Sequence, residues 1–256
     1  MEQTERPRVV MNVRASVDGK IALTPEQTLM QVPSAALWNA LFPSGDPLTA
    51  DPFVQAQQAY RCGATLEGAN SLVPVGVDPE PLPDFTGDPE PLYEHFLPHR
   101  ETAGDSPPHL WFVVVDGRGR VRWSERHPGW DVLALVCRST PADYLASLRE
   151  NAIDYLVTGE HRVDLPEALR ALRSLLGVRC LVSSAGGELN AALLRAGLVD
   201  ELVLTVAPAA IGGAATPGVL GGPALATGEH PVPLRLLSVH TDTAGLVRLH
   251  YAVGAP

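Results

Sequence analysis

Residues 181–190 read Leu-Val-Ser-Ser-Ala-Gly-Gly-Glu-Leu-Asn and hold the strongest structural signal in this chain of 256 residues. An apolar run that predicts a buried strand ends here, two glycines follow, and a helix is expected to begin at Gly187. Glycine lets the backbone approach a ligand closely, and the first N–H groups of a helix have no partner within it. The segment therefore indicates a site for an anion, although an ordinary tight turn has the same pattern.

Strands and helices alternate on both sides of this turn. Apolar runs predict strands over 8–15, 64–66, 110–115, 132–137, 153–157, 178–182 and 202–206. Amphipathic or capped segments predict helices over 52–61, 141–150, 166–176 and 187–196. The last two runs, 234–240 and 246–253, predict a closing antiparallel pair. This order is typical of an α/β fold with a central, mostly parallel sheet flanked by helices on both faces.

The composition indicates a globular chain and excludes several partners. Hydrophobic residues make up 45% of the sequence and charged residues 19%, and the net charge is −10. A protein that binds nucleic acid or an anionic membrane usually carries the opposite charge, so neither partner is expected. No apolar run approaches the roughly 20 residues that span a bilayer, and residues 1–8 do not resemble a signal peptide. These features predict a cytoplasmic protein.

The cysteines and the basic residues are both unusual. Cys62, Cys137 and Cys180 form no C-x-x-C pair, so we expect no metal site and interpret them as buried thiols that act as small hydrophobic residues. Of the 19 basic residues, Lys20 is the only lysine.

Residues 74–109 depart from the regular alternation. This stretch contains nine prolines and many acidic residues, which exclude a helix or a central strand. An interdomain linker would have the same composition, but too little chain precedes it for a stable separate domain. We therefore predict a single domain over 1–256 with a proline-rich insertion at about 74–109.

Three further segments place polar residues or glycines at expected strand ends. Residues 15–22 (Ala-Ser-Val-Asp-Gly-Lys-Ile-Ala) lead a strand into an Asp-Gly turn that presents Lys20. A solvated lysine on a hairpin-like turn explains this pattern equally well. Residues 64–71 (Ala-Thr-Leu-Glu-Gly-Ala-Asn-Ser) end in small residues that suit a helix cap or a phosphate. Residues 207–213 (Ala-Pro-Ala-Ala-Ile-Gly-Gly) open a glycine-rich loop.

In this order, the four segments resemble the reductase domain of riboflavin biosynthesis, which shares its fold with dihydrofolate reductase. Residues 15–22 are similar to that family's S-hydrophobe-D-G-K-I-A signature. Residues 197–202 (Gly-Leu-Val-Asp-Glu-Leu), followed by Pro208 and 211–213, resemble its second signature. The resemblance covers nearly the whole chain except residues 74–109.

The resemblance implies an NADPH-dependent reductase similar to 5-amino-6-(5-phosphoribosylamino)uracil reductase, commonly a homodimer. It implies that Lys20 faces the substrate and that Asp18 shapes its turn. It also implies a set of cofactor-binding residues on three turns: Gly68, Ala69, Asn70, Ser71, Arg118, Gly186, Gly187, Glu188, Leu189 and Asn190. Among these, Arg118 is expected to hold the 2′-phosphate of NADPH, with Arg120 as a second candidate on the same turn, because a guanidinium pairs well with phosphate.

Two positions depart from the family pattern. Ala185 stands where the family has a glutamate directly before the two glycines, and Glu67 stands where an apolar residue is usual. Glu67 can supply a carboxylate nearby and is therefore, together with Lys20 and Asp18, a candidate catalytic residue. The altered site leaves two alternatives open: a reductase of the same fold that acts on another heterocyclic or carbonyl substrate, or a nucleotide-binding relative without catalysis. The zinc-deaminase motifs that accompany some family members are absent, which indicates a stand-alone reductase domain.

Overall fold

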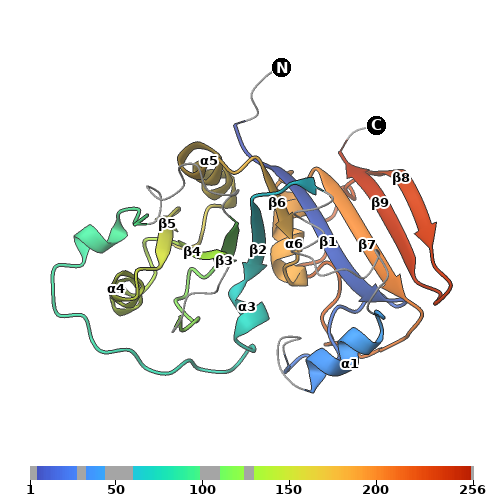
Figure 1. Ribbon diagram of the computed structural model, residues 1–256, viewed down its shortest axis with the longest axis horizontal. Helices are drawn as coiled ribbons and strands as arrows, with labels where there is room; N and C mark the ends of the chain where they lie inside the picture. Colours follow the sequence, from blue (N-terminus) through green and yellow to red (C-terminus); the bar gives the residue numbers. More distant parts are fainter. Residues whose placement is uncertain (1–4, 28–32, 44–59, 99–109, 124–129, 255–256) are drawn as a thin grey trace.

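The computed structural model describes residues 5–27, 33–43, 60–98, 110–123 and 130–254 (Figure 1). One nine-stranded sheet takes its strands from all of these segments except 33–43, in the order β5-β4-β3-β2-β6-β1-β7-β9-β8. Its strands are β1 (Arg8–Ser16), β2 (Ala64–Gly68), β3 (Trp111–Val115), β4 (Asp131–Val136), β5 (Asp154–Val157), β6 (Cys180–Ser183), β7 (Glu201–Ala207), β8 (Leu234–Thr241) and β9 (Val247–Val253).

The first seven strands are parallel, and β9 pairs antiparallel with both β7 and β8. The predicted α/β fold with a closing antiparallel pair is confirmed. Parallel strands that are covered on both faces read as continuous apolar runs, which is why the sequence located them so closely.

Helices cover both faces of the sheet (Figure 1). They are α1 (Ser34–Ala40), α3 (Ala69–Leu72), α4 (Ala142–Glu150), α5 (Leu165–Leu176) and α6 (Gly187–Arg195), with a 3₁₀ turn η3 (Glu90–Tyr93). Helices α5 and α6 share one hydrophobic core with β1, β2 and β3. Helix α4 packs on the opposite face in a second core, and α1 lies at the end of β7. The sequence did not predict α1, and the helix expected over 52–61 falls almost wholly outside the described residues.

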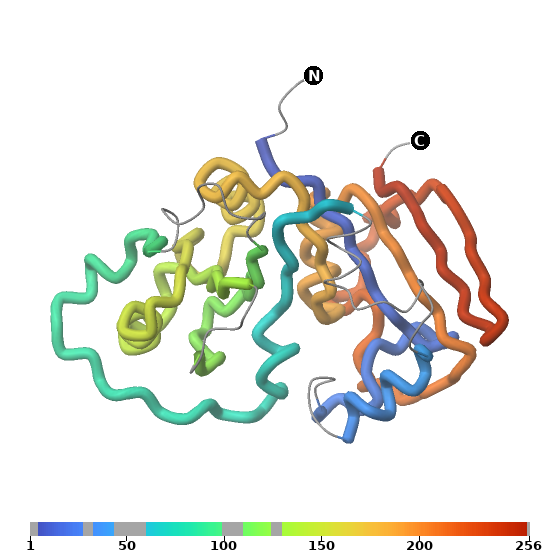
Figure 2. Tube along the Cα trace, in the orientation of Figure 1, coloured from blue at the N-terminus to red at the C-terminus, as the bar shows by residue number. Residues whose placement is uncertain are grey.

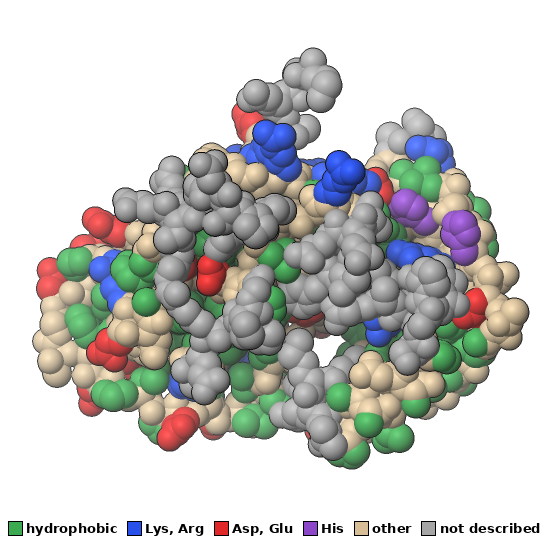
Figure 3. Space-filling view, in the orientation of Figure 1, with side chains coloured by type: hydrophobic (Ala, Val, Ile, Leu, Met, Phe, Trp, Pro, Cys, Tyr) green, Lys and Arg blue, Asp and Glu red, His purple; other side chains and the backbone are tan. Residues whose placement is uncertain are grey.

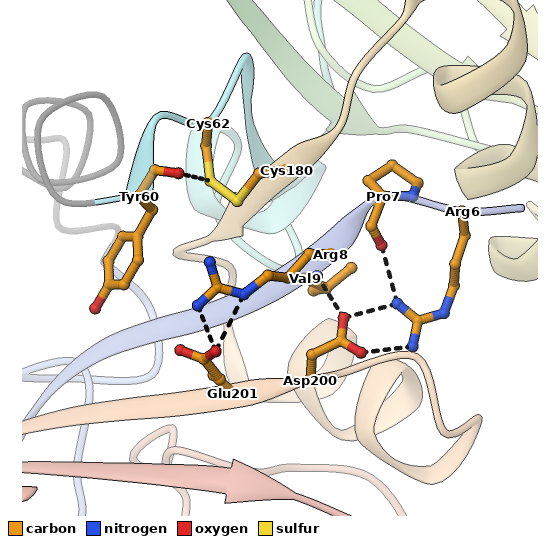
Figure 4. The surroundings of a disulfide bond; sticks show 9 residues. All are labelled: Arg6, Pro7, Arg8, Val9, Tyr60, Cys62, Cys180, Asp200 and Glu201. Atoms are coloured by element: carbon orange, nitrogen blue, oxygen red, sulfur yellow. Dashed lines mark hydrogen bonds and ion pairs between the residues drawn. A yellow bond between two sulfur atoms is a disulfide. The ribbon is translucent and has the colours of Figure 1, made fainter. Parts of the chain in front are cut away.

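The amino-terminal ends of the strands are tied together covalently and by ion pairs (Figure 4). A disulfide joins Cys62, just before β2, to Cys180 at the start of β6. The prediction of three buried thiols is therefore wrong for this pair, while Cys137 is a free, buried thiol. The sequence separation of 118 residues hides their proximity, which arises because β2 and β6 are neighbours in the sheet.

Residues 74–98 form an extended strap along the β5 edge of the sheet (Figure 2). Phe96 pairs with Tyr155 of β5 through two backbone hydrogen bonds of 3.0 and 2.8 Å, which covers part of that edge. The Arg149 guanidinium donates to the carbonyl of Pro91 at 2.6 Å. The expected irregular conformation is confirmed over 74–98 apart from η3, and residues 99–109 lie outside the described part. No helix among the described residues is long and apolar enough to cross a membrane.

Candidate functional site

The predicted site residues gather at the carboxyl ends of the strands. Parallel strands end at the same side of a sheet, and the turns that follow β1, β2, β3, β6 and β7 therefore meet there. Each of the four segments that place glycines or polar residues at expected strand ends, 15–22, 64–71, 181–190 and 207–213, contains one of these turns. Figure 3 shows one face of the molecule in a space-filling view, with Lys and Arg side chains mostly along its upper edge, toward the amino-terminal ends of the strands.

The amino terminus of α6 has open backbone donors. Gly186 is its N-cap residue and provides no capping hydrogen bond. By contrast, the side chain of Asp164 caps α5 by accepting a hydrogen bond from the backbone N–H of Glu167 at 2.8 Å. A Cβ placed on Gly186 would meet nothing within 4 Å, so there is open space beside this residue, whereas Gly218 and Gly221 lie against the next residue, Gly187. An anionic group fits there, because the helix end supplies N–H donors and the positive end of its dipole.

Gly187 lies in close contact with the glycine-rich loop after β7. A Cβ on Gly187 would be 2.3 Å from the Gly218 carbonyl oxygen and 3.0 Å from the Gly221 nitrogen. The Gly221 N–H donates to the Gly187 carbonyl at 2.9 Å, and the Gly222 N–H donates to Glu188 at 2.9 Å. The first turn of α6 thus holds residues 218–222 in place.

Asn190 supports the turn from within. It is fully buried, and its side chain accepts from the Ser183 hydroxyl at 3.0 Å and donates to the Ala185 carbonyl at 2.7 Å. Asn190 therefore fixes the conformation of the two-glycine turn. Leu189 is half-buried and packs against the core of α5 and α6.

The turn after β2 lies next to α6 and to the turn after β3. A Cβ on Gly68 would be in ordinary contact with Leu189, at 3.7 Å. The exposed Asn70 accepts a hydrogen bond of 2.6 Å from Arg120. Ala69 is buried against the α4 side of the sheet. The structure therefore brings Gly68 and Asn70 together with the other predicted cofactor residues.

Arg118 is exposed on the turn after β3. The buried carboxylate of Asp116 fixes this turn by accepting from the backbone N–H groups of Arg120 and Val121 at 2.9 and 2.8 Å, and from the Tyr144 hydroxyl at 2.9 Å. Burial, followed by the nearby Asp116 charge, raises the pKa of Tyr144 well above its usual value. No hydrogen bond or ion pair ties the Arg118 guanidinium to another described residue, so it is available to an anionic ligand.

Asp18 and Lys20 hold the loop after β7 against the turn after β1. The Asp18 carboxylate accepts from the Ser16 hydroxyl at 2.6 Å and from the N–H groups of Ile211 and Gly212 at 3.1 and 2.7 Å. The bond from Ser16, followed by those two backbone bonds, lowers the pKa of Asp18 to about 2. The Lys20 ammonium donates to the Thr216 carbonyl at 3.0 Å. Both side chains therefore position this loop.

Glu67 is a buried acid at the end of β2. Its residue surface is 7% exposed, and the Ser71 hydroxyl donates to its Oε2 atom at 2.8 Å. Burial raises the pKa of Glu67 to about 8, against a smaller opposing effect of the Ser71 hydrogen bond. The group therefore carries its proton at neutral pH.

The sequence analysis missed several polar residues on the sheet face that Glu67 shares. Asn12, Arg14, Ser184 and Thr205 alternate with apolar residues on the carboxyl-terminal halves of the central strands and just beyond them. On the amino-terminal halves, the same face carries Val10, Val182 and Val203. In residues 11–15 the polar Asn12 and Arg14 alternate with apolar residues, which indicates a polar face on this strand. The sequence analysis read the strand as one apolar run and did not use this pattern.

Comparisons with known proteins agree with this geometry. The family described as RibD C-terminal domain matches residues 7–248 of the chain. The chain is 28% identical over 213 residues to a protein of Methanothermobacter thermautotrophicus, covering 81% of both sequences. It is 29% identical over 221 residues to a protein of Archaeoglobus fulgidus, covering 85% of this chain and 87% of that one. Both relatives are named 2,5-diamino-6-ribosylamino-4(3H)-pyrimidinone 5′-phosphate reductase.

Solved structures share the fold. A pyrimidine reductase-like protein of Corynebacterium diphtheriae superposes with a TM-score of 0.65 at 19% identity, covering 98% of this chain and 93% of that one. The riboflavin biosynthesis reductase of Saccharomyces cerevisiae superposes with a TM-score of 0.57 at 13% identity, covering 99% and 93%.

Proposed function

Because the chain belongs to the RibD C-terminal domain family, we propose that it is an NADPH-dependent reductase of a pyrimidine ribosyl phosphate. The observation that carries this proposal is the meeting of three turns at one end of the sheet. They combine an uncapped helix terminus, close-approaching glycines and an exposed arginine. These groups fit a ligand with a pyrophosphate and a further phosphate.

The proposed substrate is 2,5-diamino-6-ribosylamino-4(3H)-pyrimidinone 5′-phosphate. The relatives from Methanothermobacter thermautotrophicus and Archaeoglobus fulgidus, which each match more than four-fifths of the chain, carry this name. The second candidate is 5-amino-6-(5-phosphoribosylamino)uracil. A reductase of the latter substrate from Thermotoga maritima, fused to a deaminase, shares the fold with a TM-score of 0.54.

A bound NADPH would supply a hydride, that is two electrons and a proton, to an electrophilic carbon of the substrate, and a proton from solvent would complete the reduction. The backbone N–H groups of Gly187, Glu188 and Leu189 would bind its pyrophosphate, with Gly186 leaving room for it. Gly68, Ala69, Asn70 and Ser71 would line the opposite side. Arg118 would bind the 2′-phosphate, and buried Asn190 would keep the two-glycine turn in shape.

In this proposal the other residues position the reactants and exclude water. Asp18 and Lys20 hold residues 211–218 beside the first turn of α6. Lys20 is also the only lysine in the chain and would meet the substrate phosphate when it exchanges the Thr216 carbonyl for that ligand. Correct placement of the two reactants can supply much of the rate enhancement.

We further propose that two copies associate through β8 in the cytoplasm. This strand forms an edge of the sheet, and its large apolar side chains are 41–50% exposed: Leu234, Leu236, Leu237 and Val239. Exposed apolar groups that gather on one strand are typical of an interface. Light scattering of the wild type and of Leu236→Lys tests this proposal. We expect a dimeric wild type and a variant that is more monomeric, and a monomeric wild type would contradict the proposal.

We also propose that residues 74–109 are an insertion into one reductase domain.

The experiment for the activity is a steady-state assay that follows NADPH oxidation with each pyrimidine ribosyl phosphate. We expect kcat/KM of roughly 10⁴ M⁻¹s⁻¹ or more for one of the two, which is the lower range of natural enzymes. Turnover of neither substrate, by protein that binds NADPH, would contradict the proposed substrates and favour a reductase of another compound.

A further inference from the structure

Glu67 lies in a row of polar side chains that crosses three neighbouring strands. In the sheet register, Ser183 of β6 stands opposite both Leu66 of β2 and Met11 of β1. The next residue of each segment therefore lies level with the others on the opposite face of the sheet. Those residues are Glu67, Ser184 and Asn12. Neighbouring strands are about 4.8 Å apart, so the row is about as wide as a six-membered ring with its substituents.

This row marks the change from core to site on its face of the sheet. One step toward the amino-terminal ends, the face is apolar, with Val10 and Val182 beside the Cys62–Cys180 disulfide. One step beyond it, the strands end in the turns that form the candidate site. Glu67 stands at this border, and 7% of its residue surface is exposed.

The fold itself does not explain an acid at this position. Burying a carboxyl group is costly unless its polar atoms have partners. Glu67 receives one hydrogen bond, from Ser71 to Oε2, and among the described residues its Oε1 atom has no recorded partner. The neighbouring elements β3, β6 and α3 contain no charged residue, and burial raises the pKa of Glu67 against the smaller opposing effect of the Ser71 hydrogen bond. A structural acid would be expected to have an ion pair or further donors.

We propose that Glu67 is a specificity-determining residue of the substrate site and hydrogen-bonds the edge of the pyrimidine ring through Oε1. This inference rests on the proposed function and names the part of the substrate that the polar row binds. A ring edge is favoured over the substrate phosphate, because phosphate pairs best with a cation and the cations lie elsewhere: Arg14 is two residues beyond Asn12 on β1, and Lys20 and Arg118 belong to other turns.

The protonated form gives this residue a particular chemistry. An uncharged carboxyl group both donates and accepts hydrogen bonds, whereas a carboxylate only accepts. Its elevated pKa of about 8 keeps the donor available at neutral pH. Glu67 can therefore donate to a ring carbonyl or ring nitrogen and accept from a ring amino group. Affinity for the substrate should fall as the pH rises through the pKa of Glu67.

The test is calorimetric binding of 2,5-diamino-6-ribosylamino-4(3H)-pyrimidinone 5′-phosphate to the NADP⁺ complex at pH 7 and pH 9. For the wild type we expect Kd to rise about tenfold between these values, since an acid of pKa about 8 is mostly ionised at pH 9. Glu67→Gln keeps a neutral donor and acceptor and should bind with little change over this range. Glu67→Leu should weaken binding at pH 7 by about tenfold or more.

A Kd for Glu67→Leu within twofold of the wild type, or an equal pH dependence in Glu67→Gln and the wild type, would overturn the inference. NADPH affinity serves as the folding control and should stay within twofold in both variants. If Glu67→Leu does not fold, the comparison of wild type and Glu67→Gln decides. A wild type that binds the pyrimidine but does not reduce it would overturn the proposed activity alone. A wild type that binds neither of the two candidate pyrimidine ribosyl phosphates would overturn both proposals.

Discussion

The two ends of the central strands are built differently, although the same strands supply both. At the amino-terminal end, a disulfide joins Cys62 to Cys180, and Arg6 binds Asp200 through two hydrogen bonds of 2.7 and 2.9 Å. Arg8 pairs with Glu201 in the same region (Figure 4). Arg6, Arg8, Asp200 and Glu201 thus have partners within the chain.

At the carboxyl-terminal end, several groups have no such partner. The first turn of α6 lacks a side-chain cap, Arg118 is exposed, and Glu67 has one oxygen without a recorded partner among the described residues. When contacts at one end of a parallel sheet stabilise the fold, the loops at the other end can be used to bind ligands. The comparison therefore separates substitutions that change the free energy of unfolding from substitutions that change binding.

The largest expected effect belongs to the amino-terminal end. Replacing Cys62 and Cys180 together with alanine should lower the free energy of unfolding by about 4 to 5 kcal/mol, because the bond closes a loop of 118 residues in the unfolded chain. NADPH affinity should change less than twofold. Urea unfolding measures the first effect, and reductant should reproduce it in the wild type but not in the double variant. A wild type whose unfolding midpoint ignores reductant would contradict the prediction.

The second effect is a pH dependence that arises at the carboxyl-terminal end. Burial raises the pKa of Glu67 to about 8 in the folded state, so the folded chain keeps a proton that the unfolded chain loses from about pH 4.5 upward. Stability should therefore fall as the pH rises from about 5 to 8, by up to about 1.4 kcal/mol per pH unit, and then level off.

Glu67→Gln isolates this contribution, because the amide does not titrate. Urea midpoints at several pH values should show a weaker decline in the variant than in the wild type. Parallel curves for the two proteins would show that Glu67 does not hold its proton in the folded state.

The third prediction compares two glycines, Gly187 at the start of α6 and Gly177 just after α5. Gly187→Ala places a Cβ 2.3 Å from the Gly218 carbonyl oxygen, so the loop must move away from α6. We expect NADPH affinity to fall by about 2 to 3 kcal/mol, the cost of losing hydrogen bonds to a charged ligand. The matched control is Gly177→Ala at the end of α5, which costs some stability at a positive φ of 67° but leaves NADPH binding unchanged. Equal losses of affinity in both variants would contradict the assignment.

The smallest effect concerns the capped helix. Asp164→Ala removes the side chain that accepts from the Glu167 N–H and should cost about 1 kcal/mol of stability. NADPH affinity should not change, because the end of α5 serves the fold. A loss of NADPH affinity in this variant would mean that the cofactor also reaches α5, and the contrast between the two helix ends would fail.

Local patterns in the sequence were sufficient for most of the fold. The strand predicted over 8–15 is Arg8–Ser16, and the helix predicted over 187–196 is Gly187–Arg195. These elements combine an apolar run or stripe with clear end signals, so no distant contact is needed to place them. Helix α1 is seven residues long and has no side-chain cap, and its sequence offered neither signal.

Contacts between distant segments could not be predicted in the same way. The Cys62–Cys180 bond depends on the pairing of β2 with β6, and the hydrogen bond from Lys20 to Thr216 depends on the path of the loop after β7. The polar row of Glu67, Ser184 and Asn12 exists only once the strand register is known. The sequence identified the turns of the candidate site, whereas the neighbours of each side chain come from the tertiary structure.

The most direct test of the central claim is a fluorescence titration of the wild type and Arg118→Ala with NADPH and, separately, with NADH. The account predicts that the wild type prefers NADPH, because Arg118 adds a charge-assisted hydrogen bond to the 2′-phosphate. Arg118→Ala should weaken NADPH about tenfold or more and leave NADH nearly unchanged. Failure of the wild type to bind either nucleotide, or an equal loss for both in Arg118→Ala, would contradict a cofactor site at the carboxyl ends of these strands.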